Sequence, residues 1–267
     1  VLLTLKLFYP KIKQQQQNDI LLFIVIPMKG YEKKLSRKEN LMYIEFIATT
    51  IEDALLIEKS GADRIELVCA LTEGGLTPSY ALIEAVVSSV SIPVNVMVRP
   101  HSQSFRYSPD DLSIMKNDIK IISSLGANGV VLGVLNEQNE INQIYLEELL
   151  TACEGLEITF HRAIDDTPDP VRAAEILAQY PEITTILTSG GHGDFSSRMQ
   201  TIKQMKRVCG NISILVGSGL NKDNILSVHS ELNTGYYHFG TAVRKNSSLI
   251  EGVQLEKAKE IINMLKV

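Results

Sequence analysis

The chain of 267 residues contains no tryptophan and only three cysteines, Cys69, Cys153 and Cys209. An odd number of cysteines with no CxxC pair argues against a disulfide framework and favours a reducing compartment. We therefore expect a cytoplasmic protein.

The chain also lacks an excess of basic charge and a long hydrophobic run. Its 26 basic and 31 acidic residues give a net charge of −5. The sequence has no block of basic residues of the kind that binds nucleic acid. The apolar stretch at 20–26 is too short to cross a bilayer, which takes about 20 residues. We expect a small anionic ligand as partner, and neither nucleic acid nor membrane.

Residues 1–41 differ in character from the rest of the chain. They hold a run of four glutamines at 14–17 and scattered lysines, and no small-residue cleavage site follows the apolar stretch, so a secretory signal is not expected. We interpret residues 1–41 as an upstream extension, non-native or disordered, with Met42 as the natural start and Met28 as the second candidate.

From residue 42 onward, short β-branched runs alternate with stretches of helical spacing, a pattern typical of βα units on a parallel sheet. The predicted strands are Tyr43–Ala48, Asp63–Cys69, Val94–Arg99, Gly129–Val134, Glu157–Arg162, Ile183–Ser189, Ile212–Gly217 and Gly235–Gly240. The predicted helix starts are Thr50, Pro78, Ser108 and either Pro168 or Pro170, and the predicted stops are Gly61, Gly126 and Gly155.

Eight strands can build an open doubly wound sheet or a closed barrel. The nucleotide-binding fingerprint GxGxxG is missing after the first strand. We therefore predict an α/β fold with a single (β/α)8 TIM-type barrel over residues 42–267.

Several predicted strands carry one or two polar residues among apolar ones, although strands packed on both faces are usually almost entirely hydrophobic. These polar residues are Glu45, Glu66, Asn95, Arg99, His161 and His238. Buried charges must neutralise one another or meet a ligand. The set is either an ion-pair layer that fills the barrel or a site that faces a substrate.

The end of the fifth predicted strand places His161 and Arg162 next to each other, with Asp165 shortly after them. An imidazole, a guanidinium and a carboxylate at one strand end are suited to acid/base chemistry and anion binding. Asp165 could hold the imidazole tautomer, and Arg162 could instead bond the loop that follows. We predict His161, Glu45, Glu66, Arg99 and Asp165 as catalytic residues, and Asn95 and Arg162 as ligand-binding residues.

Three later strand ends are rich in glycine. The candidate ligand-binding residues there are Ser189, Gly190, Gly191, Gly217, Ser218 and Gly219, and Gly240–Ala242 follows the last strand. Loops after strands seven and eight form the usual phosphate site of this fold. The alternative is that these glycines only make tight turns. The segment Glu73–Ser79 is either a lid over the barrel mouth or a plain turn.

Several of these segments together resemble the CutC copper-homeostasis family. The resemblance runs from about residue 42 to the C-terminus and rests on the segments Asp63–Leu67, Glu73–Ser79, Pro93–Pro100, Phe160–Ala163, Leu187–Gly191 and Gly217–Gly219. It implies a cytoplasmic TIM-type barrel that binds Cu(I), takes part in copper tolerance or trafficking, and forms a homo-oligomer.

The resemblance also bears on the cysteine ligand. Many relatives carry a cysteine directly after the Glu-Leu of the second strand, where this chain has Val68, and Cys69 follows one residue later. A shift of one residue along a strand turns the side chain to the opposite face. Cys69 is the candidate Cu(I) ligand, offset by one from the family position.

Two main hypotheses follow. The resemblance favours a copper-homeostasis protein. The residues themselves favour a lyase, isomerase or hydrolase that acts on a small phosphorylated or carboxylated metabolite at the C-terminal rim. A third reading, a barrel that serves only as an oligomeric scaffold, gives no reason for Glu45, Glu66, Asn95, Arg99 and His161 to occur together.

Overall fold

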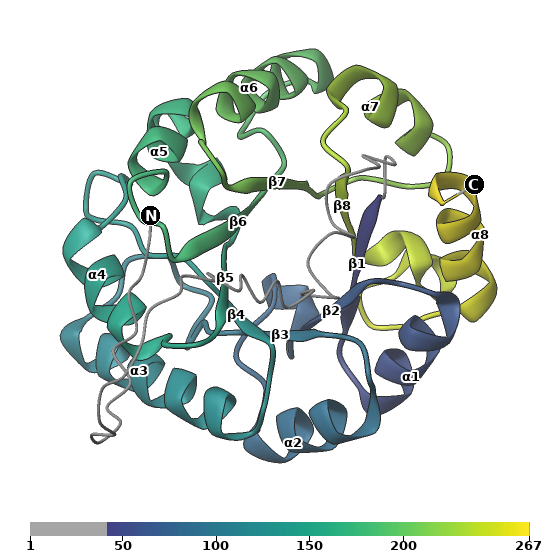
Figure 1. Ribbon diagram of the computed structural model, residues 1–267, viewed down its shortest axis with the longest axis horizontal. Coiled ribbons are helices and arrows are strands. Elements are labelled where there is room, and N and C mark those ends of the chain that lie inside the picture. Colours follow the sequence, from purple (N-terminus) through teal and green to yellow (C-terminus); the bar gives the residue numbers. More distant parts are fainter. Residues whose placement is uncertain (1–41, 267) are drawn as a thin grey trace, which may run out of the picture. The chain divides into compact units, whose positions relative to one another are not determined.

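The β-branched runs form parallel strands that close on themselves. The computed structural model describes residues 42–266, and within them each strand pairs in parallel with the next along the chain, while β8 returns to pair with β1 (Figure 1). The strands are β1 Tyr43–Ala48, β2 Arg64–Leu67, β3 Val94–Met97, β4 Gly129–Leu132, β5 Glu157–Phe160, β6 Ile183–Thr188, β7 Ser213–Val216 and β8 Tyr236–Phe239. The predicted single (β/α)8 barrel is confirmed. The extension predicted for residues 1–41 lies outside the described residues.

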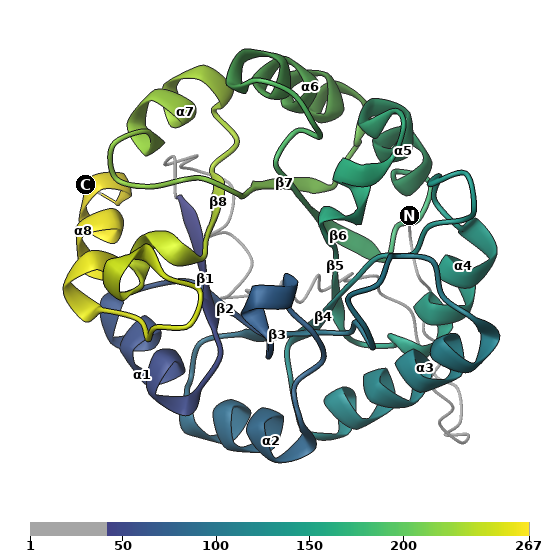
Figure 2. The same cartoon turned by 180° about the vertical axis from the view of Figure 1, so that it is seen from behind.

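The helices form a ring around the strands, seen from the two ends of the barrel in Figures 1 and 2. They are α1 Ile51–Ser60, α2 Tyr80–Ser89, α3 Pro109–Ser124, α4 Gln143–Ala152, α5 Pro170–Leu177, α6 Phe195–Val208, α7 Ile225–Leu232 and α8 Leu255–Leu265. Four short 3-10 turns lie in the loops: η1 Leu71–Glu73, η2 Arg162–Asp166, η3 Thr241–Val243 and η4 Lys245–Ser247.

Most of the predicted helix ends are confirmed by capping contacts. The hydroxyl of Thr50 accepts a hydrogen bond from the N–H of Asp53, and Ser108 forms a capping box with Asp111. The prediction that Pro78 opens the second helix is wrong. That helix begins at Tyr80, two residues after Pro78, because the Ser79 side chain accepts a hydrogen bond from the N–H of Leu82 and so caps the helix.

The strand ends also differ from the prediction. Only β1 has the predicted bounds, and the other seven strands begin or end one or two residues inside them. At the rim each strand separates from the adjacent strand and the chain turns toward a helix. Apolar or β-branched residues there no longer pair with the adjacent strand. One consequence is that β2 ends at Leu67, before Cys69.

Two apolar layers enclose a polar one. The main hydrophobic core lies between strands and helices, and a small apolar cluster of Ile47, Val68, Met97 and Val131 lies among inward-facing positions near the C-terminal ends of the strands. Between them, the buried polar residues include Glu45, Arg64, Glu66, Asn95, Thr159 and His238. Neighbouring residues along a strand therefore face the barrel interior and the helix layer in turn.

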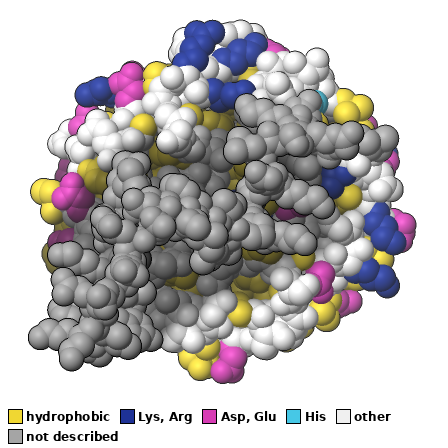
Figure 3. Space-filling model, in the orientation of Figure 1, with side chains coloured by type: hydrophobic (Ala, Val, Ile, Leu, Met, Phe, Trp, Pro, Cys, Tyr) yellow, Lys and Arg dark blue, Asp and Glu magenta, His cyan; other side chains and the backbone are white. Residues whose placement is uncertain are grey.

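The described surface carries charges of both signs. Basic and acidic side chains lie around the perimeter of the face shown in Figure 3, with basic ones most numerous over the edge formed by α6. Among the residues that the structure describes, no helix has the length and apolar character needed to cross a membrane.

Candidate active site at the C-terminal rim

A cavity of about 500 Å³ lies at the C-terminal ends of the strands. Strand ends and loops from several βα units line it, and the polar side chains on its wall include Glu66, Arg99, His161, Arg162, Ser218 and His238. This is the end of the barrel where TIM-type enzymes carry their sites. The cavity therefore joins several of the residues predicted from separate strands.

Below the cavity, Glu45 forms a buried ion pair. One of its carboxylate oxygens accepts a hydrogen bond from Nε of Arg64, and the other lies 2.7 Å from Nδ1 of His238. Burial by itself would raise the pKa of Glu45, but the Arg64 guanidinium and His238 outweigh it and lower the pKa to about 2. Glu45 is therefore ionised at neutral pH, which makes Nδ1 of His238 the donor.

The pKa of Glu66 is shifted in the opposite direction from that of Glu45. Its carboxyl is buried, it lines the cavity, and its Oε1 has no hydrogen-bond partner among the described residues. Its Oε2 lies 3.7 Å from Nε2 of His238. Burial raises the pKa of Glu66 to about 7, although His238 opposes the rise. Two neighbouring carboxyls thus have pKa values pushed far apart.

His238 connects these two carboxyls. Burial alone would lower its pKa, but the carboxylates of Glu66 and Glu45 outweigh burial and raise it. Glu66 and His238 therefore retain a shared proton to higher pH than either group would in water.

His161 lies at the end of β5, and its ring is neutral. Its Nδ1 accepts a hydrogen bond of 3.1 Å from the N–H of Ala163, so the ring proton is on Nε2. Burial and the positive charge of Arg99 lower the pKa of His161 to about 3. The imidazole is therefore a hydrogen-bond donor at neutral pH.

Arg99 follows β3 and holds the loop between β2 and α2. Its Nη1 donates to the carbonyl oxygens of Glu73 and Gly75, at 3.0 and 3.3 Å. That loop folds back on itself through an antiparallel bridge between Cys69 and Leu76, and Glu73 and Gly74 line the cavity. The start of the segment Glu73–Ser79, for which the sequence left a lid and a plain turn open, is thus part of the cavity wall and is held by Arg99.

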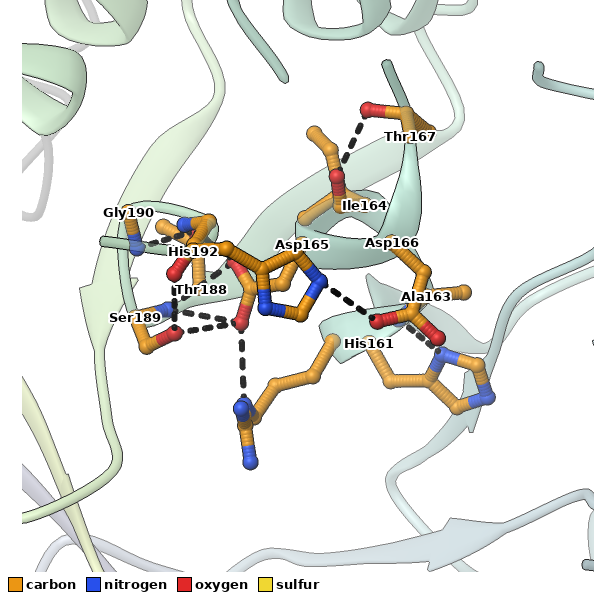
Figure 4. A network of polar contacts seen from close by, with 12 residues as sticks. His161, Ala163, Ile164, Asp165, Asp166, Thr167, Thr188, Ser189, Gly190 and His192 are labelled. Carbon is orange, nitrogen blue, oxygen red and sulfur yellow. Dashed lines mark hydrogen bonds and ion pairs between the residues drawn. The ribbon is translucent and has the colours of Figure 1, made fainter. Parts of the chain in front are cut away.

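The carboxylate of Asp165 is held by hydrogen bonds from the loop after β6 (Figure 4). One carboxylate oxygen accepts from the Thr188 hydroxyl at 2.6 Å and from the N–H of Gly191 at 3.0 Å, and the other accepts from the Ser189 hydroxyl at 2.7 Å. Arg162 donates to Asp165 at 2.9 Å. The carboxylate therefore clamps the loop after β6.

These contacts settle two alternatives left open by the sequence. Asp165 makes no hydrogen bond to the imidazole among the described residues, and the tautomer of His161 is set by the N–H of Ala163. Arg162 bonds Asp165 and also lines the cavity. The alternative in which Asp165 holds the imidazole is therefore excluded, because its oxygens bind the β6 loop.

The glycine-rich loops differ from one another. In the loop after β6, the N–H groups of Ser189 and Gly191 already donate to Asp165, and a Cβ on Gly190 would overlap the backbone of Arg198. The glycines of this loop therefore form a tight turn, the second of the two alternatives. In the loop after β7, Ser218 and Gly219 line the cavity together with Thr241 after β8.

Gly217 and Asn95 do not line the cavity. Gly217 packs against Leu187 and His238, where a Cβ would come within 2.8 Å of the leucine side chain. Asn95 is buried deeper in the barrel, and its Oδ1 accepts from Asn128 at 2.8 Å.

Cys69 also lies off the cavity wall. Its Sγ donates to the carbonyl oxygen of Thr77 at 3.1 Å, and burial raises the pKa of the thiol. Val68, the residue before Cys69, packs inside the barrel against Met97 and Val131. Cys153 and Cys209 are buried at the C-terminal ends of α4 and α6.

The donor chemistry of the site does not match Cu(I). Among the described residues, Glu45, Glu66 and His238 form a group whose potential ligand atoms all lie within 4.8 Å of one another. These are oxygen and nitrogen donors, whereas Cu(I) prefers sulfur. Glu45 is already bound to Arg64 and His238. We therefore interpret the group as a proton-sharing cluster.

Three residues that shape the site were not among the predicted site residues. His238 was expected only as one of the polar residues of the strands. Phe105, from a loop with no distinctive pattern, has its ring 4.6 Å from Cζ of Arg99 and 4.9 Å from the His161 ring. Gly133 makes room for His161, since a Cβ there would lie 2.5 Å from the imidazole.

Solved structures show the same fold. A protein described as a copper homeostasis protein CutC from Streptococcus agalactiae is 31% identical with a TM-score of 0.69, over 74% of this chain and 98% of its own. A phosphoribosyl anthranilate isomerase from Thermococcus kodakaraensis superposes with a TM-score of 0.58 at 14% identity, over 84% of this chain and 99% of its own. The second likeness concerns the barrel alone.

Sequence comparisons give the family. The family model for the CutC family matches residues 42–242. The CutC family protein of Histophilus somni is 37% identical over 209 residues, 78% of this chain and 86% of its own. The copper homeostasis protein cutC homolog of Homo sapiens is 34% identical over 211 residues, 79% and 77% of the two chains. With this match and these identities, the chain belongs to the CutC family.

Proposed function

We propose that this protein is an enzyme in which Glu66 moves a proton to or from a carbon atom of a small polar metabolite, as in a lyase or isomerase step. One observation carries the proposal. Glu66 is a buried carboxyl on the cavity wall with one unpartnered oxygen and a pKa of about 7, beside Glu45, which stays ionised.

A general base works best when its pKa lies near the operating pH. Two adjacent carboxyls with separated pKa values are a recurrent feature of acid/base sites. Here Arg64 and His238 stabilise the charge of Glu45, while burial disfavours the charge of Glu66. Glu66 is therefore the proton carrier, and Glu45 with His238 positions it.

The cavity suits a small ligand. A volume of about 500 Å³ lies within the usual range of small-molecule sites, roughly 300–1,000 Å³. Arg99 has no carboxylate within ion-pair distance among the described residues, and Arg162 also lines the cavity. Their positive charges favour a carboxylated or phosphorylated metabolite.

Proton exchange with solvent tests the proposal directly. In D₂O, the wild type should replace a carbon-bound hydrogen in a member of a panel of 2-oxo acids, hydroxy acids and sugar phosphates, followed by proton NMR. The rate should rise with pH through about 7 and then level off, because ionised Glu66 is the base. Glu66→Gln should slow it by at least about 10²-fold. Exchange that survives this substitution, or none across the panel, would contradict the proposal.

The relatives' name gives a second candidate function, the binding of Cu(I) in copper homeostasis, with Cys69 as the ligand. The printed name of the human relative refers to copper homeostasis. Against it, Cys69 has a raised thiol pKa, whereas a thiolate is the form that binds metal.

An anaerobic Cu(I) titration against a competing chelator separates the two candidates. We expect wild type and Cys69→Ser to bind Cu(I) equally weakly, because Cys69 lies off the cavity wall and the other two cysteines are buried at the ends of α4 and α6. His161→Ala serves as the control for the rim. Tight stoichiometric binding that is lost only in Cys69→Ser would establish a copper site.

We further propose a cytoplasmic location and a homo-oligomer. The three cysteines are free thiols, which supports a reducing compartment. The oligomer stays a prediction from the family resemblance.

A further inference from the structure

The neutral imidazole of His161 has an unused donor. Its Nδ1 is bonded to the N–H of Ala163, and its Nε2 is buried with no hydrogen-bond partner among the described residues. A buried N–H without a partner is destabilising, because it has lost its hydrogen bonds to water and gained none in return, so its retention calls for an acceptor. Because His161 lines the cavity, a bound ligand is placed to supply one.

Gly133 fixes which edge of the ring is available. A Cβ at this position would lie 2.5 Å from Cε1 and Nδ1 of His161 and 3.0 Å from Cβ of Ala163. The Cε1–Nδ1 edge of the ring is therefore packed against the end of β4. Nε2 lies beyond this packed edge, on the side away from Ala163.

Arg99 carries a second unused donor on the same wall. Its Nη1 and Nη2 are bonded to backbone carbonyl oxygens, while its buried Nε has no partner among the described residues. Phe105 packs against the Arg99 guanidinium and the His161 ring, at 4.6 and 4.9 Å. The side chains that carry the two donors are thus packed against one aromatic ring.

We propose that Arg99 and His161 together bind the carbonyl oxygen of the substrate, and that the substrate is a small 2-oxo acid or similar carbonyl compound with a hydrogen on the adjacent carbon. This inference rests on the proposed function of Glu66. It adds the class of substrate and the groups that stabilise the intermediate.

The chemical step balances without an oxidant or a further reactant. The C–H bond next to the carbonyl breaks, and its proton moves to the carboxylate of Glu66. The electron pair forms the C=C bond of an enolate, and the carbonyl π electrons move to oxygen. That oxygen accepts hydrogen bonds from Nε2–H of His161 and Nε–H of Arg99, and the proton returns to carbon in the second half of the reaction.

A neutral imidazole is suited to this role. Because the pKa of His161 is about 3, the ring stays a neutral donor across the physiological range. Neutral histidine next to a developing enolate is an established way to stabilise negative charge. The nearby guanidinium of Arg99 adds a positive charge that favours the enolate.

Oxalate is the probe, because it is a planar anion that resembles the enolate of a 2-oxo acid. Its binding is measured by calorimetry in metal-free buffer for wild type, His161→Asn and His161→Gln. Asparagine keeps an oxygen near Nδ1 for the N–H of Ala163 but has no donor at Nε2, whereas the amide nitrogen of glutamine lies near the Nε2 position. Melting temperatures verify that each variant is folded.

We expect His161→Asn to weaken oxalate binding by about ten- to a hundredfold, the size of a hydrogen bond to a charged group. His161→Gln should stay within about threefold of the wild type, since its amide restores the donor. Arg99→Lys keeps the charge but removes Nε–H, and it should also weaken binding. Equal affinity in the two His161 variants, or no oxalate binding to the wild type, would overturn the inference.

Glu66→Gln separates this inference from the proposed function. It should bind oxalate at least as tightly as the wild type, because it removes a negative charge, while it loses hydrogen exchange. Oxalate binding that depends on His161, with no exchange for any substrate, would overturn the role of Glu66 and leave the donor pair standing. Hydrogen exchange that depends on Glu66 but is equal in the two His161 variants would overturn the donor pair and leave the role of Glu66 standing.

Discussion

Replacing Glu66 with glutamine should stabilise the protein progressively relative to the wild type as the pH rises from 5 to 8. The folded pKa of Glu66 is about 7, above the value of about 4.3 in an unfolded chain. Between these values the folded state binds more protons than the unfolded state, so the stability of the wild type falls as the pH rises. Glutamine removes this dependence, and the difference between the two proteins should change by roughly 3 kcal/mol.

Chemical denaturation at pH 5 and pH 8 measures this change. His161 titrates in the opposite sense, since its folded pKa is lowered and its stabilisation is lost as the pH falls, but it is present in both proteins. Glu73→Gln is the matched control: Glu73 is an exposed carboxyl at the same cavity, and its substitution should alter stability equally at both pH values. A difference between wild type and Glu66→Gln that is the same at pH 5 and pH 8 would refute a raised pKa for Glu66.

Asp165→Ala should lower the free energy of unfolding by about 3–5 kcal/mol at pH 7, as expected when one partner of a buried ionic network is removed. The carboxylate accepts hydrogen bonds from two hydroxyls and two backbone N–H groups of the β6 loop, and it pairs with Arg162. Burial would raise its pKa, but the hydrogen bonds from Thr188 and Ser189 and the Arg162 charge lower it. The loss should therefore shrink as the pH falls below about 4.

Asp166→Ala is the control for this prediction. Asp166 is the next residue, its side chain is half exposed, and its partner is the exposed His192 at 3.4 Å. Its loss should change stability by less than about 0.5 kcal/mol. Denaturant unfolding compares the two variants, and an Asp165→Ala loss as small as that of Asp166→Ala would show that the β6 loop does not depend on this carboxylate.

The contacts of Asp165 also explain which of the two alternatives for the glycine-rich loop after β6 the structure favours. Thr188–Gly191 has the composition of an anion-binding loop, and it does bind an anion, but that anion is the carboxylate of Asp165 more than twenty residues earlier in the chain. A sequence pattern shows that backbone N–H groups can converge. Whether a ligand or a side chain satisfies them depends on which other segment packs there.

The inward-facing residues were easier to predict. Side chains alternate along a strand, so Glu45, Glu66 and His161 were placed in the barrel interior by their positions alone. The pattern could not show that Glu45 would be ionised and Glu66 held near neutrality. That difference comes from Arg64 and His238, which reach Glu45 from two neighbouring strands.

The sequence by itself determined the repeated βα units, the barrel and the end of it that carries polar residues, because apolar periodicity, caps and turn glycines act over a few residues. Only the tertiary structure decided which side chains meet. It joined Glu66 to His238 across the closure of the barrel, assigned Asp165 to the β6 loop, and placed His161 and Arg99, each with an unpartnered donor, among the residues that line one cavity. These outcomes depend on distances between segments far apart in the chain, and burial there sets each pKa through the neighbours it supplies.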